Sequence, residues 1–195
     1  MYTFGDGAGG CLGHGDEQSC KTPKLVDALA GERVVAVSAG VSHSMAVTVE
    51  GKVFSWGWDE HDGGYMGHGN FATQMVPKQI RALAGCRVVA VDASWAHSLM
   101  VTAGGKLYSC GNNEHGQLGH GDKESRAVPA EVEELEGIVS AAGDGHSQGY
   151  SFASTQTGAV LSWGCGANGT LGHGDGADRT VPTPLGLRGA VQAGL

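Results

Sequence analysis

The sequence has few charged residues, few aromatic residues and no long apolar run. Of its 195 residues, 16% are charged and 6% are aromatic, whereas 41% are hydrophobic. A chain this poor in charge is not expected to be disordered, and no apolar stretch is long enough to span a membrane. The first residues, MYTFGDGAGG, lack the basic start and apolar stretch of a signal peptide. We therefore expect a folded intracellular protein, cytoplasmic or nuclear, without membrane contact.

Paired cysteines are also missing. The five cysteines form no CxxC motif, and their number is odd. A disulfide framework is built from an even set of cysteines, so the pattern favours a reducing compartment.

Motifs of the common enzyme classes are absent as well. The sequence has no GxSxG elbow, no P-loop and no HExxH. The string GDGAGG at 5–10 resembles a phosphate-binding loop, but no helical pattern follows it. We therefore predict a protein that is not an enzyme, with no catalytic residue, no cofactor and no metal.

Glycine, in contrast, is abundant, and it recurs at fixed places. Among the 35 glycines are four copies of Gly-His-Gly, around histidines that are 54, 52 and 53 residues apart. Before each copy stands a short segment closed by glycine, such as FSWG at 54–57, and after each copy comes a proline-led segment. Self-similarity at a constant period is typical of a repeat architecture.

The period divides the chain into repeat units without a linker. Each full unit contains four short apolar segments with turn signals between them, and the third segment alternates large and small residues, as at 53–56. Four antiparallel strands repeated radially form a β-propeller, so the predicted fold class is all-β. The predicted units are about 1–33, 34–87, 88–137 and 138–189, with 190–195 starting the next.

Three segments resemble the repeat of the regulator of chromosome condensation family: SAGVSHS at 38–44, GKVFSWGWDEHDGGYMGHG at 51–69 and GKLYSCGNNEHGQLGHG at 105–121. The resemblance covers essentially residues 1–195. It implies a seven-bladed ring, of which this chain supplies about three and a half to four blades. We therefore expect the ring to be completed by further blades, from a longer protein or from a second chain.

Seven of the nine histidines recur at repeat positions and are predicted to be structural. A motif repeated once per blade indicates architecture, and neighbouring copies lie about one blade spacing of ~10 Å apart, too far to share a metal ion. We expect each imidazole to hydrogen-bond backbone in a glycine-rich turn. The positions are His14, His43, His68, His97, His120, His146 and His173.

The last full unit departs from its siblings. When His146 is aligned with His43 and His97, the hairpin between the second and third strands becomes longer, at 147–159. We therefore expect an insertion in this hairpin.

An acidic face with tryptophans is the candidate site for a partner. The loops of one propeller face carry most of the acidic residues, and the formal net charge is −8. Charge complementarity and aromatic anchors suit a basic protein surface, and the lack of a basic stripe argues against nucleic acid. Alternatively, the acidic residues only keep the loops soluble. The candidate residues are Trp58, Asp59, Glu60, Asp62, Trp95, Glu114, Asp122, Asp144 and Asp175.

The resemblance implies three classes of function. The first is a protein-interaction platform, or scaffold, as in family members attached to large ubiquitin ligases. The alternative is guanine-nucleotide exchange on a small GTPase, the activity of the founding member, for which the hairpin at 147–159 is the one candidate contact. The third, ultraviolet-B reception as in the plant receptor, is disfavoured, because SWAH at 94–97 has Ala96 in place of arginine and the sibling units lack the tryptophan.

Overall fold

The computed structural model describes residues 1–59, 63–144 and 149–186, which form strands and short 3-10 helices. A two-stranded sheet comes first, made of β1 (Tyr2–Gly5) and β2 (Cys20–Leu25). The strands of the three later sheets are β3 (Val34–Ala39), β4 (His43–Thr48), β5 (Val53–Gly57), β6 (Gln74–Gln79), β7 (Val88–Ala93), β8 (His97–Thr102), β9 (Leu107–Gly111), β10 (Arg126–Glu131), β11 (Ile138–Gly143), β12 (Tyr150–Thr155), β13 (Val160–Gly164) and β14 (Arg179–Pro184).

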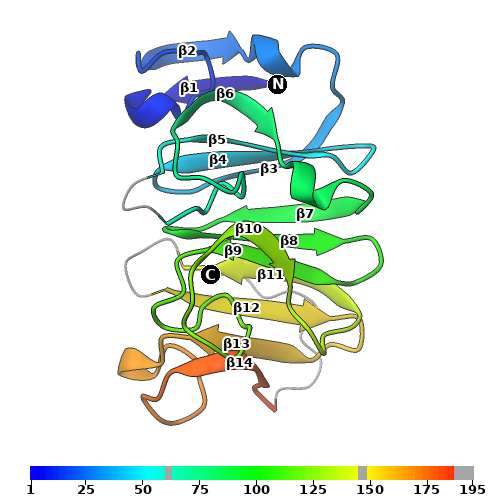
Figure 1. Cartoon of the computed structure of the whole chain (residues 1–195). Coiled ribbons are helices and arrows are strands. Elements are labelled where there is room, and N and C mark those ends of the chain that lie inside the picture. The colour runs from blue at the N-terminus through cyan, green and yellow to red at the C-terminus, as the bar shows by residue number, and fades with distance from the viewer. Residues whose placement is uncertain (60–62, 145–148, 187–195) are drawn as a thin grey trace.

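The three later sheets are antiparallel and keep their strands in chain order, β3 to β6, β7 to β10 and β11 to β14. Figure 1 shows the sheets stacked from β1 and β2 at the top to β14 at the bottom. Strand β7 lies against β3 and β4, and β11 lies against β7 and β8, so the sheets meet along their first strands. This is the arrangement of propeller blades, and the predicted all-β class with four-stranded blades is confirmed.

Apolar side chains fill the spaces between the sheets. Phe54 and Trp56 of β5 pack with Val26 and Leu29, which follow β2, whereas Val53 belongs to the cluster shared with the sheet after. The alternation along the strand thus supplies both of its faces with core residues. Burial of each large apolar side chain contributes about 1.5–3 kcal/mol to folding.

The fourth strand of each later sheet contains a proline. Strand β6 starts three residues before Pro77, and the 3-10 helix η4 (Arg81–Leu83) follows it. Pro77 is tolerated because β6 is the outer strand, where no ladder hydrogen bond from its nitrogen is needed. None of the helices in the described residues is long and apolar enough to cross a membrane.

The insertion predicted in the hairpin at 147–159 is wrong. The turn between β12 and β13 is closed by a hydrogen bond of 2.9 Å from the Thr155 amide to the Ala159 carbonyl. Equivalent hydrogen bonds from the Thr48 amide, at 3.0 Å, and from the Thr102 amide, at 2.9 Å, close the turns of the two preceding sheets. The three turns are therefore the same, and none protrudes.

Strand pairing shows where the alignment failed. Tyr150 pairs with the glycine that ends β13, just as His43 and His97 pair with the glycines that end β5 and β9. Tyr150 therefore occupies the repeat position assigned to His146. His146 itself lies outside the described residues, in the connection before β12. The extra residues of this unit belong to that connection.

Candidate functional site

The Gly-His-Gly loops are tied to their own sheets by a repeated hydrogen bond. In each loop, histidine Nε2 faces a hydroxyl of the strand that precedes the loop, and the same hydroxyl donates to a loop carbonyl, as Ser109 does to Leu118 at 2.8 Å. The partner of Nε2 is therefore a side chain, not the backbone expected from the sequence. The pairs are His14–Thr3 at 3.0 Å, His68–Ser55 at 3.0 Å, His120–Ser109 at 2.9 Å and His173–Ser162 at 3.0 Å.

This geometry fixes the tautomer of the loop histidines. A carbonyl oxygen can only accept a hydrogen bond, so the hydroxyl donates its proton to the carbonyl. The imidazole must then donate its Nε2–H to the hydroxyl oxygen. Burial, with Lys78 beside it, lowers the pKa of His68 to about 4. Burial and Arg126 do the same for His120, whose pKa is also about 4. Both rings are neutral near pH 7 and act as loop braces.

The histidines that begin β4 and β8 link one sheet to the next. His43 Nε2 lies 2.8 Å from Ser98 Oγ, and His97 Nε2 lies 2.9 Å from Ser151 Oγ. Each serine also donates to a carbonyl in the loop between the third and fourth strands of the preceding sheet, Ser98 to Tyr65 at 2.7 Å and Ser151 to Gln117 at 2.8 Å. The Ser–His pairs therefore form between sheets and not between neighbours on one strand.

These Ser–His pairs do not activate a nucleophile. The serine proton is donated to a carbonyl, so the histidine donates to Oγ instead of accepting from it. Burial lowers the pKa of His43 to about 3 and that of His97 to about 4, so neither is poised as a base near pH 7. All four side chains of the two pairs are buried. Their arrangement is that of a structural link.

A second link between sheets was not found from the sequence. Asp92 on β7 accepts from the amide of Gly143 on β11 at 2.9 Å and from the hydroxyl of Ser94 at 2.6 Å. Burial raises the pKa of this carboxyl. The sibling strand carries Ser38, which accepts from the Ala93 amide at 3.0 Å. Only the tertiary contacts show that Asp92 and Ser38 both accept a hydrogen bond from a backbone amide of the next sheet.

The acidic residues of the candidate partner site have different environments. Asp59 and Asp144 are buried, and Asp59 accepts from the Gly64 amide at 3.0 Å. Asp122 and Asp175 form ion pairs of 2.8 and 2.7 Å with Arg126 and Arg179. These arginines hold the pKa of each of the two carboxyls below its usual value. Two of the candidate carboxylates, Asp122 and Asp175, are therefore paired with cations within the chain.

The Asp or Asn that follows each Gly-His-Gly closes a local turn. Its side-chain oxygen accepts from the amide two residues later, a turn that Asp and Asn favour. The distances are 3.0 Å for Asp16, 3.1 Å for Asn70, 3.0 Å for Asp122 and 3.1 Å for Asp175.

Trp58, Glu114 and Asp175 are the exposed members of the candidate set among the residues that the structure describes. The Trp58 side chain is 45% exposed. Its backbone amide donates a hydrogen bond of 2.8 Å to the Ser42 carbonyl. Trp95 is half-buried. Glu60 and Asp62 lie outside the described residues. The structure brings Trp58 and Glu114 to the same end of the stack, which we name the loop face: the loops 6–19, 58–59, 63–73, 112–125 and 165–178.

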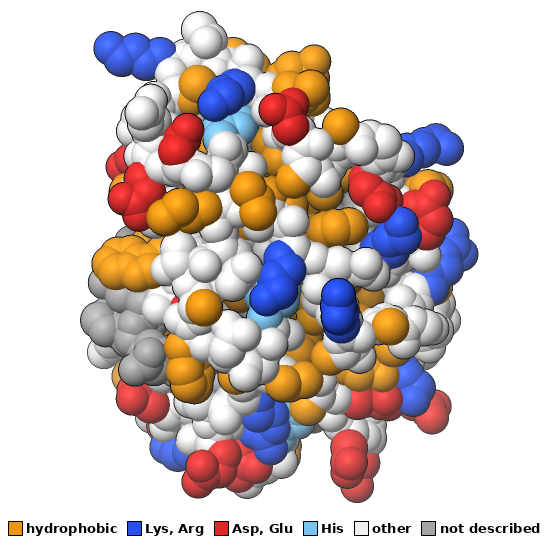
Figure 2. All heavy atoms as spheres, turned by 45° about the horizontal axis from the view of Figure 1, so that its top comes forward, with side chains coloured by type: hydrophobic (Ala, Val, Ile, Leu, Met, Phe, Trp, Pro, Cys, Tyr) orange, Lys and Arg blue, Asp and Glu red, His pale blue; other side chains and the backbone are white. Residues whose placement is uncertain are grey.

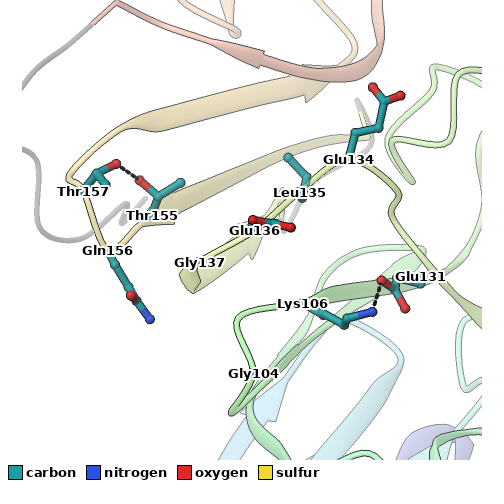
Figure 3. A pocket seen from close by; sticks show the side chains of 10 residues that line it. All are labelled: Gly104, Lys106, Glu131, Glu134, Leu135, Glu136, Gly137, Thr155, Gln156 and Thr157. Atoms are coloured by element: carbon teal, nitrogen blue, oxygen red, sulfur yellow. Dashed lines mark hydrogen bonds and ion pairs between the residues drawn. The ribbon is translucent and has the colours of Figure 1, made fainter.

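The opposite end, where the hairpin turns lie, has a cavity of about 640 Å³ between two sheets (Figure 3). Glu131, Glu134 and Glu136 line it, and Lys106 forms an ion pair of 2.6 Å with Glu131. These three glutamates give the cavity an acidic lining.

The first sheet leaves large apolar side chains uncovered. Tyr2 and Phe4 are 64% and 65% exposed, whereas Phe54 and Trp56, at the same positions of β5, are 8% and 1% exposed. Figure 2, with the top of the stack turned forward, shows hydrophobic side chains across the surface and no continuous basic stripe on this view.

Proteins with related sequences occur in several functional classes. The chain is similar to the ultraviolet-B receptor UVR8 of Arabidopsis thaliana, with 40% identity over 93% of this chain and 41% of the receptor. It is 41% identical to the E3 ubiquitin-protein ligase HERC2 of Homo sapiens over 95% of this chain and 4% of the ligase. The chain therefore spans less than half of these relatives.

Solved structures show the same fold. Human WBSCR16 superposes with a TM-score of 0.81 at 23% identity, covering 95% of this chain and 48% of that protein. Prp20p of Saccharomyces cerevisiae, whose structure was described with its binding to Gsp1p and histones, gives 0.75 at 23% identity, covering 94% and 45%.

The model of the regulator of chromosome condensation (RCC1) repeat matches four segments, at residues 1–47, 50–101, 104–148 and 157–193. These matches include nearly the whole chain and begin near the strand that precedes each Gly-His-Gly loop. The repeated Gly-His-Gly loops and the strands around them thus coincide with copies of a known repeat, and the chain belongs to the RCC1 repeat family.

Proposed function

We propose that this chain is a protein-interaction platform whose loop face binds a partner with a basic surface. The observation that carries the proposal is the exposure of Trp58, at 45%, on the loop face, where a hydrogen bond fixes its backbone. A large aromatic side chain held in place loses little entropy on binding and is a frequent anchor of interfaces.

Charge supports a basic partner. Glu17, Glu114 and Glu124 are exposed on the loop face, and the net charge of the chain is −8. Lys123, also exposed there, is engaged by Asp178 at 3.1 Å. Complementary charge of this kind raises association rates and selects among partners. The proposed contact residues are Trp58 and Glu114, with Trp95 beside the loops.

Guanine-nucleotide exchange is the competing function, because it is the activity of the founding member of the family. The sequence offered a protruding hairpin for it, and that hairpin is an ordinary turn. The polar groups that the loops contain are largely used within the fold. Binding without catalysis is therefore the better account of the described residues.

We also propose that the outer face of the β1–β2 sheet is covered by another blade of the same repeat type. Tyr2 and Phe4 occupy positions that bury against a neighbouring sheet elsewhere in the chain. Ser44 occupies the position of Ser98 and Ser151, and in the described residues its hydroxyl bonds only to the Cys11 carbonyl, at 3.0 Å. In the later sheets the histidine that bonds this serine begins the second strand of the preceding sheet, so a histidine on a strand paired with β1 would complete the repeated link.

The test is to cross-link the purified chain to proteins of a cell extract and then to measure the binding of the recovered partner with purified components. Trp58→Ala and Glu114→Lys are expected to weaken binding, and Glu50→Lys, on the opposite end, is expected to retain it. Equal binding by all variants would place the interface elsewhere and overturn the proposal. Release of GDP from a small GTPase, accelerated by the chain, would favour exchange instead.

A further inference from the structure

Three side chains of different chemistry meet where the last two sheets adjoin. His115 lies in the loop after β9, Cys165 follows β13, and Asp178 precedes β14. One nitrogen, sulfur or oxygen atom from each lies within 4.8 Å of the other two. His115 Nδ1 is 3.4 Å from Asp178 Oδ2. From this arrangement we infer a binding site for a zinc ion that joins the two loops.

The ligand types favour zinc over magnesium or calcium. Zn²⁺ binds thiolate, imidazole and carboxylate, usually as four ligands in a tetrahedron, whereas Mg²⁺ and Ca²⁺ take oxygen ligands. In a tetrahedral zinc site neighbouring ligand atoms are about 3.4–3.6 Å apart. The His115–Asp178 distance already fits, and Cys165 needs only a small movement. Three protein ligands leave the fourth position for water.

The backbone around the site is held without the metal. The Gly166 amide donates to Asp178 Oδ1 at 3.1 Å, so Oδ2 is turned towards His115. The Thr170 hydroxyl donates to the Cys165 carbonyl at 2.6 Å, and the Cys165 amide donates to the Gly149 carbonyl at 3.0 Å. Both ligand-bearing positions of the last sheet are thus fixed, and little ordering entropy remains to be lost on binding.

The sibling loops show that folding does not require these ligand types. Where Asp178 caps the Gly166 amide, Ser125 caps the Asn113 amide at 3.2 Å and Ser19 caps the Gly7 amide at 3.2 Å. A serine is therefore sufficient for the loop, and the second carboxylate oxygen is additional.

The cysteine position shows the same departure. Two of the three equivalents of Cys165, Asn112 and Asp6, use their side-chain oxygens to cap the amide two residues later, each at 3.1 Å, and the third equivalent is Trp58. A thiol does not reproduce this strong acceptor. At this junction the chain thus gives up a loop cap and places sulfur beside imidazole and carboxylate. Two independent departures from the repeat converge on one point.

Lys123 is the group that a metal would displace. Its Nζ lies 3.1 Å from Asp178 Oδ2, and its side chain is 51% exposed, so it is free to move into solvent. It competes with a cation for the same oxygen. Removal of this ammonium group is therefore expected to strengthen metal binding, which a purely structural ion pair would not do.

The experiment is a titration of the purified, metal-free chain with Zn²⁺, and with Co²⁺ as a spectroscopic probe. We expect one ion per chain, a sulfur-to-cobalt charge-transfer band, and a higher unfolding temperature with zinc. Cys165→Ser should abolish the band, and Asp178→Ser, which restores the sibling's cap, should weaken zinc by roughly tenfold or more. Lys123→Met should strengthen it. Cys86→Ser serves as the control and should bind like the unaltered chain.

Circular dichroism of each metal-free variant separates loss of binding from loss of folding. The inference is overturned if the folded chain binds no zinc, or if Cys165→Ser and Asp178→Ser bind it as tightly as Cys86→Ser does. A cobalt spectrum without a sulfur band would likewise overturn it, because the thiolate is one of the three ligands.

Discussion

His43 Nε2 lies 2.8 Å from Ser98 Oγ, and the two residues belong to adjacent sheets and are 55 positions apart in the chain. The same relationship joins His97 to Ser151 at 2.9 Å. Since both atoms are buried, this hydrogen bond is protected from water and links the sheets in a fixed orientation. The repeated AHS and SHS motifs are therefore inter-blade contacts.

Ser98→Ala is expected to destabilise the chain by about 1–3 kcal/mol, because it leaves the Nε2–H of His43 buried without its acceptor. Ser44→Ala is the matched control: in the described residues Ser44 bonds to a carbonyl but to no histidine. Urea unfolding should show the larger loss for Ser98→Ala. Equal losses would mean that the histidine bond adds nothing to stability.

Acid should destabilise the chain through the two buried histidines. The folded-state pKa values of His43 and His97, about 3 and about 4, lie below the ordinary 6.5. The unfolded chain therefore binds protons first, and stability present above about pH 6.5 is lost as the pH falls towards 4. From about pH 7 to about pH 5.5 each histidine should account for about 1 kcal/mol.

The check on that pH dependence is urea unfolding at several pH values, with His43→Gln as the variant. Glutamine retains an N–H donor and does not titrate, so the variant should lose less stability on acidification than the unaltered chain. An unchanged pH dependence would show that His43 is not a source of it.

Gly119→Ala should cost more stability than Gly85→Ala. Both glycines have positive φ, +82° and +89°, so each substitution carries the left-handed penalty of about 1–2 kcal/mol. A Cβ at Gly119 would also come within 3.0 Å of Trp163 Nε1 and 3.2 Å of Pro182 Cδ, whereas none would contact the Cβ at Gly85. Thermal unfolding of the two variants isolates the contact. Similar melting temperatures would show that Trp163 and Pro182 move aside without loss of stability.

Substitution of Tyr2 and Phe4 by serine should reduce self-association. These side chains are 64% and 65% exposed, and apolar surface of this size favours contact between chains. Light scattering on a sizing column would give the mass at several concentrations. Val181→Ser, at a residue 50% exposed on the outer strand β14, is the control. A mass that is unaffected by the Tyr2 and Phe4 changes would exclude this face as the contact.

The sequence alone was sufficient for the repeat, the strand order within a unit and the all-β class. These follow from local patterns: glycine and proline at turns, alternation at 53–56, and a period near 53 residues. Because each sheet is a meander of neighbouring strands, its topology needs no long-range information.

Motif matching failed where a position was conserved in geometry but not in residue type. Tyr150 stands where the siblings have histidine, so a match by residue type selects His146 instead and assigns the extra residues to the wrong connection. Strand pairing decides this register, because Tyr150 must face the glycine that ends β13.

Only the tertiary structure decided which polar groups are already engaged. Asp59 and Asp144 read as exposed acids in the sequence but are buried, and Asp122 is paired with Arg126. Likewise His115, Cys165 and Asp178 belong to two sheets and converge only when those sheets stack. The sequence determines what each blade is because blade folding is local. The neighbours across a blade boundary are about one repeat away, so contacts there depend on how the sheets pack.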